Sequence, residues 1–581
     1  APLGLQQVKV GGEIGRRIDV TIDNNLMKID VDKDFLEPFV QKDHSSGFVG
    51  VGMLIDAAAG LAAYSKDPLV IARKEHLIDT LLANQEEDGY IGMMKPEARI
   101  WALWDIHEMA YIIQGLVRDY RLFGNERSLL AARKVANCII DRWTAEPDRK
   151  PGGGDITVFM AVTGIEPAML MLYAETGCPR YLTFCTQFRK LGEWKPDIII
   201  GRWGPVGGHA YAHCSRTIAQ LWLDAVLPDR TLLNSSRDVM DFLLKSNGIA
   251  ITGACGYREC WHDTQDGTAH LGETCDTAYL LRLWNELLLG EGSSLYGDLM
   301  ERAIYNALFS AQSRDGRKIR YYVPTEGPRV YFPRDSYCCP NNYRRVVSLL
   351  PRYVYYTTAD GVAVNLYTPS TAELKLPDGI ALTLRQETEY PSDGKVTIHV
   401  TPSEPCKFAV RLRIPRWTTD ATIAVNGEKL DQPCTAGSFV TVSRSWKEGD
   451  RIELDLPMSW RWIRGRRAQA GRVALMRGPI VFCLNRASHD ELKDVDLREL
   501  VVVPETLEGP VADDSVRPGG LACKLRAWGP EQWYPHSKPA VELTLTESVD
   551  PGSEQTWFKI ANPREEYLVD DELINIPVDR N

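Results

Sequence analysis

The chain has 581 residues, of which 44% are hydrophobic, so it is long enough to bury the cores of two or three globular domains. Its formal net charge of −11 argues against a nucleic acid or an anionic membrane as a partner, because binding to either needs a basic protein surface. No apolar run reaches the length of about eighteen residues that crosses a bilayer.

The cysteines point to a reduced protein. Thirteen of them are scattered along the chain without regular spacing, which is not the pattern of a disulfide-stapled fold. The chain starts at Ala1-Pro2-Leu3-Gly4 without an initiator methionine, as it would after removal of a signal peptide or of a tag. We therefore expect a bacterial periplasmic protein, with the cytoplasm as the alternative compartment.

The first segment alternates apolar and polar residues. Residues 7 to about 30 contain Ile18-Asp19-Val20-Thr21-Ile22, which is typical of a strand. Because the helical region that follows offers no strand partner, we expect residues 1–25 to pair with the C-terminal β region.

Ten amphipathic segments then follow in pairs, separated by Gly, Pro and Asp. This pattern predicts an (α/α)6 helical toroid over residues 26–355. The expected helices are Leu54 to Tyr64, Ile71 to Asn84, Trp101 to Leu122, Ser128 to Trp143, Met160 to Thr176, Tyr181 to Leu191, Tyr211 to Val226, Thr231 to Leu244, Asp276 to Leu289 and Gly297 to Ala311.

The texture after Tyr353 is that of an all-β protein. Short alternating strands such as Val396-Thr397-Ile398-His399-Val400 recur with turn signals every eight to twelve residues. A new series of strand-like segments begins near Gly471-Arg472-Val473 and indicates a further β module. We therefore expect two antiparallel β-sandwiches, at residues 356–467 and 468–581, which brace the toroid.

Two short motifs supply the residues of a soft metal site. Cys338 and Cys339 are adjacent, and Glu273-Thr274-Cys275 lies some sixty residues upstream. Three thiolates and one carboxylate match the tetrahedral shell of Zn²⁺. A vicinal disulfide between the tandem cysteines and a purely structural zinc site are the alternatives. An alternative set of metal ligands is Cys255, Cys260, His262 and His270.

These motifs resemble glycoside hydrolase family 127, the β-L-arabinofuranosidase family. The resemblance rests on Glu273-Thr274-Cys275 followed by Cys338-Cys339-Pro340, and it covers nearly the whole chain. The supporting segments are Ile106-His107-Glu108, Gly208-His209-Ala210 and Arg477-Gly478-Pro479-Ile480-Val481.

The resemblance implies a retaining, exo-acting hydrolase that releases an L-furanose from plant cell-wall oligosaccharides. Zinc would be held by Glu273, Cys275, Cys338 and Cys339. Cys338 would be the nucleophile that forms a thioglycosyl intermediate, and Glu259 in Gly256-Tyr257-Arg258-Glu259-Cys260 would be the general acid/base. His107, His209 and Tyr321 would contact the sugar. The chemistry is consistent on physical grounds, since coordination to Zn²⁺ deprotonates a thiol.

The chain departs from the family pattern in one place. The family carries Pro-Gly-His where this chain has Val162-Thr163-Gly164, so one sugar-binding histidine is missing. Arg258 and Arg202 instead offer cations that suit a substrate carboxylate. The resemblance implies release of L-arabinofuranose or of an acidic branched furanose such as the aceric acid of rhamnogalacturonan II, and the missing histidine and the two arginines favour an acidic or otherwise unusual furanose.

Two other functions remain open from the sequence. One is a non-catalytic carbohydrate-binding protein with a structural zinc. The other is a zinc-dependent uronate lyase, for which Tyr321, Tyr322 and His209 are the candidate bases. A homodimer is compatible with the sequence.

Overall fold

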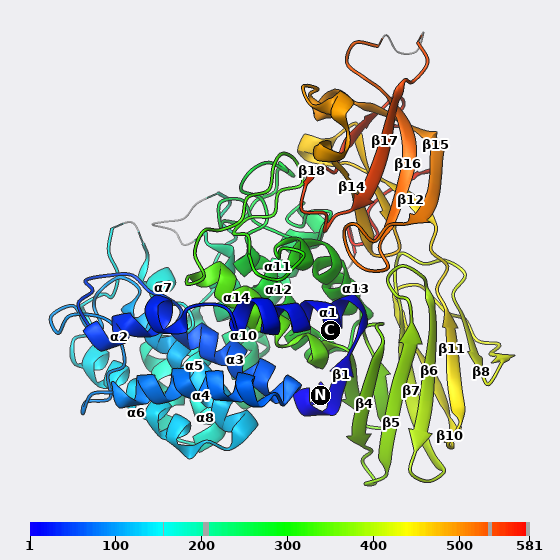
Figure 1. Cartoon of the computed structure of the whole chain (residues 1–581). Coiled ribbons are helices and arrows are strands. Elements are labelled where there is room, and N and C mark those ends of the chain that lie inside the picture. The colour runs from blue at the N-terminus through cyan, green and yellow to red at the C-terminus, as the bar shows by residue number, and fades with distance from the viewer. Residues whose placement is uncertain (155, 202–207, 533–536, 577–581) are drawn as a thin grey trace.

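A computed structural model describes residues 1–154, 156–201, 208–532 and 537–576. It contains a helical domain and two β modules (Figure 1). Among the helices of these residues, none combines the length and the apolar character needed to cross a membrane.

Six inner helices form a closed ring in which each helix contacts the next. They are α3 (Val51–Ser65), α5 (Asp105–Phe123), α8 (Ile165–Thr176), α10 (Ala210–Val226), α12 (Thr274–Glu291) and α14 (Cys338–Val347). Six outer helices each pack mainly against one inner helix. They are α4 (Pro68–Ala83), α6 (Glu126–Ala145), α9 (Pro179–Thr183), α11 (Asn234–Lys245), α13 (Ser294–Arg302) and α1 (Gly12–Thr21). The expected helical toroid is confirmed; α2 (Glu37–Gln41) and α7 (Val158–Ala161) lie in its connections.

The sixth helical pair differs from the sequence-based expectation. The strand predicted around Ile18 is wrong, because residues 12–21 form α1, which lies against α14 (Figure 1). Ile14, Ile18 and Ile22 recur every four residues and are all buried, which is the spacing of one helix face. The helix α14 is not among the ten helices expected from the sequence. The barrel thus begins near residue 12 rather than residue 26.

Close backbone contact holds the inner ring together. Gly52 of α3 faces α5 so closely that a Cβ there would lie 2.1 Å from the backbone nitrogen of Ile112. In the same layer, Asp56 accepts bonds of 2.6 Å from both Arg118 and Arg345. These arginines hold the pKa of the buried Asp56 below its usual range against the effect of burial. The network ties α3, α5 and α14 beneath the candidate site.

The first β module is a two-sheet sandwich, as expected. One sheet has the order β1-β4-β5-β6-β11-β8-β9 and the other β10-β7-β3-β2. The strands are β1 (Val8–Val10), β2 (Tyr355–Thr358), β3 (Gly361–Val364), β4 (Ser370–Lys375), β5 (Ala381–Thr388), β6 (Lys395–Pro402), β7 (Cys406–Ile414), β8 (Thr422–Val425), β9 (Glu428–Lys429), β10 (Ser438–Trp446) and β11 (Asp450–Asp455). The N-terminal strand β1 pairs antiparallel with β4, and Pro2 forms a single antiparallel bridge with Tyr356, so the N-terminus returns to the β region at these residues.

The second β module is one nine-stranded sheet rather than two facing sheets. Its order is β18-β14-β17-β16-β15-β19-β13-β12-β20, and an added β13–β14 pairing closes six strands into a ring. The strands are β12 (Trp460–Arg464), β13 (Arg472–Arg477), β14 (Ile480–Asn485), β15 (Val501–Ala512), β16 (Leu521–Trp528), β17 (Val541–Glu547), β18 (Ser553–Gln555), β19 (Phe558–Ile560) and β20 (Leu568–Val569). The module therefore starts at Trp460, before the expected residue 468.

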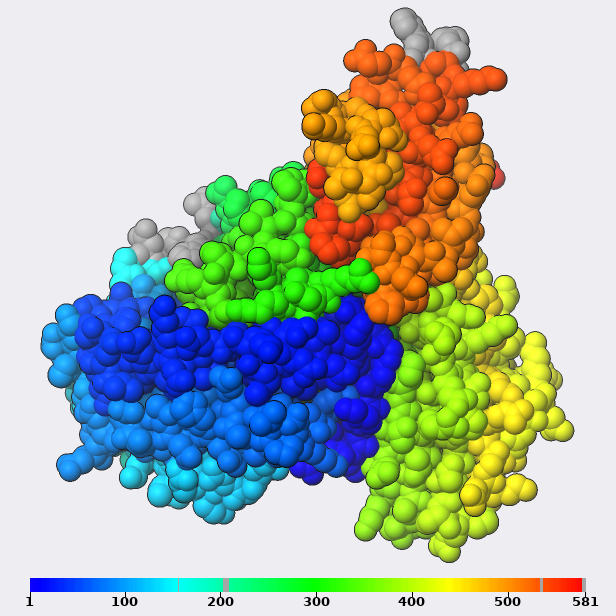
Figure 2. All heavy atoms as spheres, viewed as in Figure 1, coloured from blue at the N-terminus to red at the C-terminus, as the bar shows by residue number. Residues whose placement is uncertain are grey.

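Both β modules are joined to the barrel at the outer helix α13 and the turn after it. Arg413 of the first module pairs with Glu301 at 2.7 Å, and both side chains are buried. Asn306 donates to the carbonyl of Pro479 and accepts from the amide of Val481, each at 2.8 Å. The Arg477–Val481 motif is therefore an interdomain joint. In the space-filling view, the green barrel loops meet the orange and red surface of the second module (Figure 2).

Candidate active site

The beginnings of three inner helices supply the central residues of the site. His209 and Glu273 are the N-caps of α10 and α12, and Cys338 is the first residue of α14. The N-terminal end of a helix carries partial positive charge, so it stabilises thiolates and carboxylates. The fold thus directs the positive ends of α12 and α14 at Glu273 and Cys338, whose side chains can carry negative charge.

The four residues expected to hold a metal lie together. Glu273, Cys275, Cys338 and Cys339 are all buried, and their ligand atoms lie within 4.8 Å of one another. Cys339 Sγ lies 3.3 Å from both Cys275 Sγ and Glu273 Oε1. Cys338 and Cys339 are free cysteines, so the vicinal-disulfide alternative is not what the structure contains.

The donor set fits a soft divalent cation. Burial raises the pKa values of the Glu273 carboxyl and of the Cys275 and Cys339 thiols well above their usual range. Glu273 Oε2 is buried without a hydrogen-bond partner among the described residues. A bound cation would favour the ionised form of all these groups. The alternative set of Cys255, Cys260, His262 and His270 is not among the clusters of the described residues that are tight enough for a metal.

A buried carboxyl that the sequence reasoning passed over lies beside this cluster. Asp276 directly follows Cys275. A carboxylate oxygen of Asp276, a carboxylate oxygen of Glu273 and a ring nitrogen of His209 all lie within 4.8 Å of one another. Burial raises the pKa of the Asp276 carboxyl well above its usual range. Gly256 approaches it so closely that a Cβ there would lie 2.2 Å from Asp276 Oδ2. The position of Asp276 within the first motif was its only sequence signal.

Asn342 orients one sulfur of the cluster. Its Nδ2 donates to Cys275 Sγ at 3.2 Å, and its Oδ1 accepts from Arg345 Nη1 at 2.9 Å. Arg345 is in turn fixed by Asp56. Such outer partners of a metal site restrict the ligand to one orientation and favour its ionised form.

Substituting Asn342→Ala is expected to weaken zinc affinity about 10- to 100-fold, because Cys275 loses the donor that stabilises its charge. Competition with a chromogenic chelator measures the affinity. Asn341→Ala is the matched control, since Asn341 is equally buried and bonds to the carbonyl of Val49 rather than to a sulfur. Equal affinities in the two variants would contradict the assignment.

Cys338 differs from the other two cysteines of the cluster. Its residue is 6% exposed, whereas Cys275 and Cys339 are fully buried. Burial by itself would raise the pKa of the Cys338 thiol, but hydrogen bonds with Cys275, Cys339 and Tyr321 outweigh it and lower the pKa well below its usual range. The preceding Tyr337 has φ of 129°, a strained conformation for a residue other than glycine. Cys338 is therefore the sulfur most available for reaction.

Glu259 is presented by a tight turn. Cys260 N donates to Tyr257 O at 3.2 Å, and the two central residues, Arg258 and Glu259, have φ of 49° and 68°. Turns of this type usually contain Asn-Gly, so the Arg-Glu pair holds strain. The turn is fixed where Ala210 N donates to Glu259 O at 2.9 Å.

Tyr321 links the two residues expected to do the chemistry. Its hydroxyl donates to Glu259 Oε1 and lies 3.6 Å from Cys338 Sγ. The carboxyl and the sulfur therefore lie on either side of one hydroxyl group. His209 Nε2 lies 3.8 Å from Glu259 Oε2. The structure thus brings together Cys338, Glu259, Tyr321 and His209, as the sequence analysis expected.

The two expected sugar-binding histidines are neutral. Burial lowers the pKa of His107 to about 3 and that of His209 to about 4. His107 Nε2 lies 3.1 Å from the hydroxyl of Tyr211, and its buried Nδ1 has no hydrogen-bond partner in the described part of the chain. Neutral imidazoles both accept and donate hydrogen bonds, which suits sugar hydroxyls.

The structure describes only one of the two arginines expected to bind the substrate. Arg258 is exposed and lines a cavity of about 430 Å³ together with Glu259, His270 and Tyr322. Arg202 lies outside the described residues. At the start of α8, where the family histidine is missing, Thr163 Oγ1 donates to Met160 O.

Aromatic rings that the sequence reasoning missed lie against Tyr337 and His107. Phe48 stacks on Tyr337 with a centroid distance of 4.7 Å and contacts His107 at 4.6 Å. Trp104 lies 5.4 Å from His107. Flat aromatic faces are surfaces on which the apolar faces of sugars stack. These residues belong to loops without a motif, so only the fold reveals them.

His213, one turn after His209 in α10, makes the stability depend on pH. Burial between Trp194 and Trp261 lowers its pKa to about 3, against about 6.5 in the unfolded chain. As pH falls below ~6.5, the imidazole of His213 binds a proton in the unfolded chain but not in the folded protein. The free energy of unfolding therefore decreases with falling pH. His213→Asn is therefore expected to remove about 2 kcal/mol of the stability difference between pH 7 and pH 5. Urea unfolding at pH 7 and at pH 5 measures the free energy of unfolding. The same loss of stability between the two pH values in wild type and variant would contradict the prediction.

Comparison with known proteins agrees with this geometry. The pattern described as β-L-arabinofuranosidase, GH127 catalytic domain, matches residues 35–352, which is more than half of the chain, and that of the GH127 middle domain matches residues 361–458. A non-reducing end β-L-arabinofuranosidase of Bifidobacterium longum subsp. longum is 27% identical over 508 residues, covering 75% of each chain.

Two solved structures share the fold. A family 127 β-L-arabinofuranosidase from Geobacillus stearothermophilus T6 is 24% identical, with a TM-score of 0.79 over 95% of this chain and 100% of that one. A family 127 β-arabinofuranosidase is 23% identical, with a TM-score of 0.81 over 96% and 97%. The chain belongs to glycoside hydrolase family 127, and the protein is a glycoside hydrolase.

Proposed function

We propose that the protein is an exo-acting, retaining β-L-arabinofuranosidase that uses Cys338 as nucleophile and Glu259 as general acid/base. The observation that carries the proposal is the Tyr321 hydroxyl, which contacts both the Glu259 carboxyl and the Cys338 sulfur. The names of the relatives support the substrate class. Retaining glycosidases place nucleophile and acid about 5–5.5 Å apart, and groups that share one hydroxyl are near that separation.

The reaction consists of two displacements at the anomeric carbon. In the first, the Cys338 thiolate forms a C–S bond, the glycosidic C–O bond breaks, and Glu259 gives its proton to the leaving oxygen. In the second, Glu259 takes a proton from water, the water oxygen bonds to the anomeric carbon, and the C–S bond breaks. Two inversions retain the configuration and restore both residues.

Glu273, Cys275, Cys338 and Cys339 would hold Zn²⁺, for which three sulfurs and one carboxylate are suitable ligands. When bound, zinc would keep the thiols deprotonated at neutral pH. The protein's own part is to hold the sulfurs: α14 fixes Cys338 at its first turn, and Asn342 fixes Cys275. His107, His209 and Tyr321 would bind the sugar hydroxyls.

An acidic branched furanose, such as aceric acid, is the second candidate for the released sugar. Arg258 favours it, because this exposed cation lines the same cavity as Glu259. A guanidinium group pairs with a carboxylate through two parallel hydrogen bonds. The chemistry at the anomeric carbon is the same for both sugars.

The test is mass spectrometry of the monosaccharides released from a panel of L-arabinofuranosides and rhamnogalacturonan II oligosaccharides. Release of a neutral pentose supports the arabinofuranosidase, and release of a branched acid supports the second candidate. Products that absorb in the ultraviolet as unsaturated sugars would establish the lyase instead. If zinc-loaded protein binds these oligosaccharides but releases no sugar from them, the hypothesis of a non-catalytic carbohydrate-binding protein replaces both proposed hydrolase activities.

A further inference from the structure

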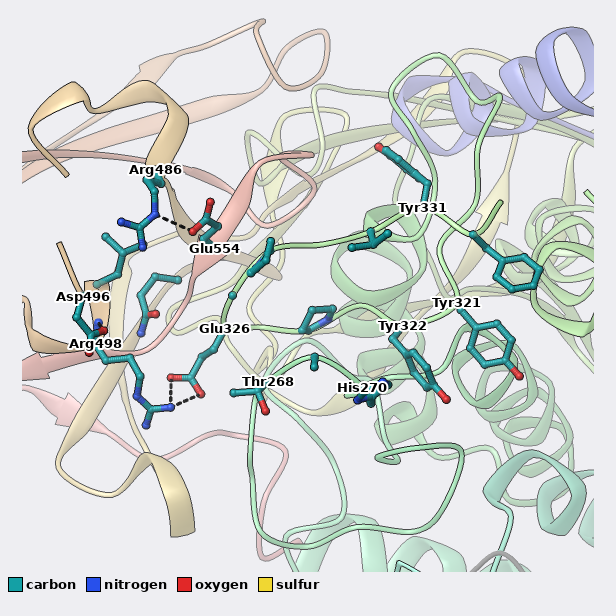
Figure 3. A pocket seen from close by; sticks show the side chains of 18 of the residues that line it. Thr268, His270, Tyr321, Tyr322, Glu326, Tyr331, Arg486, Asp496, Arg498 and Glu554 are labelled. Carbon is teal, nitrogen blue, oxygen red and sulfur yellow. Dashed lines mark hydrogen bonds and ion pairs between the residues drawn. The ribbon is translucent and has the colours of Figure 1, made fainter. Parts of the chain in front are cut away.

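A second cavity lies between the barrel and the second β module. Its volume is about 700 Å³, within the ~300–1,000 Å³ that ligand sites occupy. The loop over residues 321–333 forms one wall, with Tyr322 and Phe332, and the β module forms the other, with Arg486, Arg498 and Glu554. Figure 3 shows Tyr321, Tyr322 and Tyr331 opposite the arginines and Glu554. We call this cavity the interdomain groove.

A continuous series of aromatic rings connects the groove with the candidate active site. Phe48 stacks on Tyr337 beside Cys338, and Tyr337 lies 5.7 Å from Phe332 in the groove. Phe332 lies 5.4 Å from Tyr321, and Tyr321 lies 4.8 Å from Tyr322. Because Tyr321 also touches Glu259, the groove begins beside the residue that protonates the leaving oxygen. It therefore lies on the leaving-group side of the bond.

The opposite wall carries planar polar groups in fixed positions. Arg486 Nε donates to Glu554 Oε2 at 2.9 Å, and Arg498 Nη1 lies 3.3 Å from Glu326. Each cation already has a carboxylate partner, so neither is left to neutralise an acidic ligand. An aromatic wall facing paired polar groups matches the apolar ring faces and the hydroxyl edges of neutral sugars.

The groove is preformed by backbone contacts between its two walls. Gly327 N donates to Glu554 O at 2.7 Å, and Thr556 N donates to Thr325 O at 3.1 Å. These bonds fasten the barrel loop to the β module. A rigid groove binds a chain without the cost of ordering its own walls.

We propose that the interdomain groove binds the chain of neutral sugars on the leaving-group side of the scissile bond, so that the second β module takes part in substrate selection. The proposal rests on the proposed function, which puts the leaving group beside Glu259. It predicts that the enzyme prefers a terminal furanose attached to a neutral oligosaccharide over the same furanose attached to a small aryl group.

The test uses Val330→Trp in the intact protein. Val330 lines the groove and is 75% exposed, so a larger side chain there fills the groove without disturbing a core. Val511→Trp is the matched control, because Val511 is 48% exposed on the second β module and does not line the groove. We compare kcat/KM for a 4-nitrophenyl furanoside with kcat/KM for the same furanose on a neutral tetrasaccharide. The ratio that favours the oligosaccharide should fall about tenfold in Val330→Trp and stay the same in Val511→Trp. An unchanged ratio in Val330→Trp overturns the proposal.

A binding measurement separates failure of this proposal from failure of the proposed function. Calorimetry with arabinotetraose, galactotetraose and tetragalacturonate probes the groove without any hydrolysis. Saturable binding of a neutral probe that weakens about tenfold in Val330→Trp supports the groove even where wild-type protein hydrolyses nothing. Absence of binding by both neutral probes, or tighter binding of tetragalacturonate, overturns the proposal.

Discussion

Replacing Cys338 by serine is expected to lower kcat/KM for furanosides at least about 10³-fold, because deletion of a nucleophile removes the step on which the other catalytic groups act. The serine hydroxyl keeps the size of the thiol but is a far weaker nucleophile near neutral pH. The other three members of the cluster, Glu273, Cys275 and Cys339, keep their donor atoms as the proposed zinc ligands. The measurement is steady-state kinetics on protein whose zinc content has been determined.

Cys339→Ser is the matched control, since it makes the same atomic change in the same cluster. Cys339 is fully buried, and its sulfur lies 3.3 Å from Glu273 Oε1, where it can act as a ligand. At saturating zinc, this variant should retain far more activity than Cys338→Ser. Equal losses at equal zinc content would show that the two sulfurs serve only the metal site and would refute the nucleophile assignment.

Intact-protein mass spectrometry gives an independent readout for Cys338. The mechanism requires a sugar bonded to its sulfur between the two displacements. Brief incubation with an activated furanoside should add the mass of one sugar residue to the wild type and nothing to Cys338→Ser. An adduct on the serine variant would place the covalent bond elsewhere.

The central residues of the site could be predicted because their motifs are contiguous in sequence. Cys338 and Cys339 are neighbours, and Glu273 and Cys275 lie on one helical turn, so the residue types alone indicate metal chemistry. Asn342 carries no such signal. It reaches Cys275 only because α12 and α14 are adjacent in the closed ring. Support of this kind depends on helix order, which a single sequence does not display.

The missed elements have a similar physical origin. Residues 18–22 fit a strand as well as a helix, and the contact of α1 with α14 decides between them. The turn at Arg258 and Glu259 has no glycine to mark its positive φ values, so its geometry was hidden. The interdomain groove joins Tyr322 to Arg498, residues far apart in the chain, and only the docking of the second β module brings them together.

Glu259→Gln is expected to reduce hydrolysis of natural glycosides about 10²- to 10⁴-fold, which is the contribution of a positioned general acid/base. The amide keeps the shape of the carboxyl and can still accept the hydrogen bond of the Tyr321 hydroxyl. It can neither give a proton to the leaving oxygen nor take one from water. Asp263→Asn is the control, because it makes the same change on the same loop outside the assembled site.

The loss should depend on the leaving group, and this dependence separates a catalytic carboxyl from a structural one. A 4-nitrophenolate leaves without protonation, so the first displacement on Cys338 proceeds in Glu259→Gln while the second is slow. Stopped-flow kinetics should therefore show a burst of 4-nitrophenol equal to the enzyme concentration, followed by slow turnover that added azide accelerates. A variant that is equally slow with aryl and natural substrates, with neither burst nor azide rescue, would mean that Glu259 only holds the turn in place. The general acid would then have to be another of the buried carboxyls near Cys338, such as Asp276, whose pKa burial raises well above its usual range.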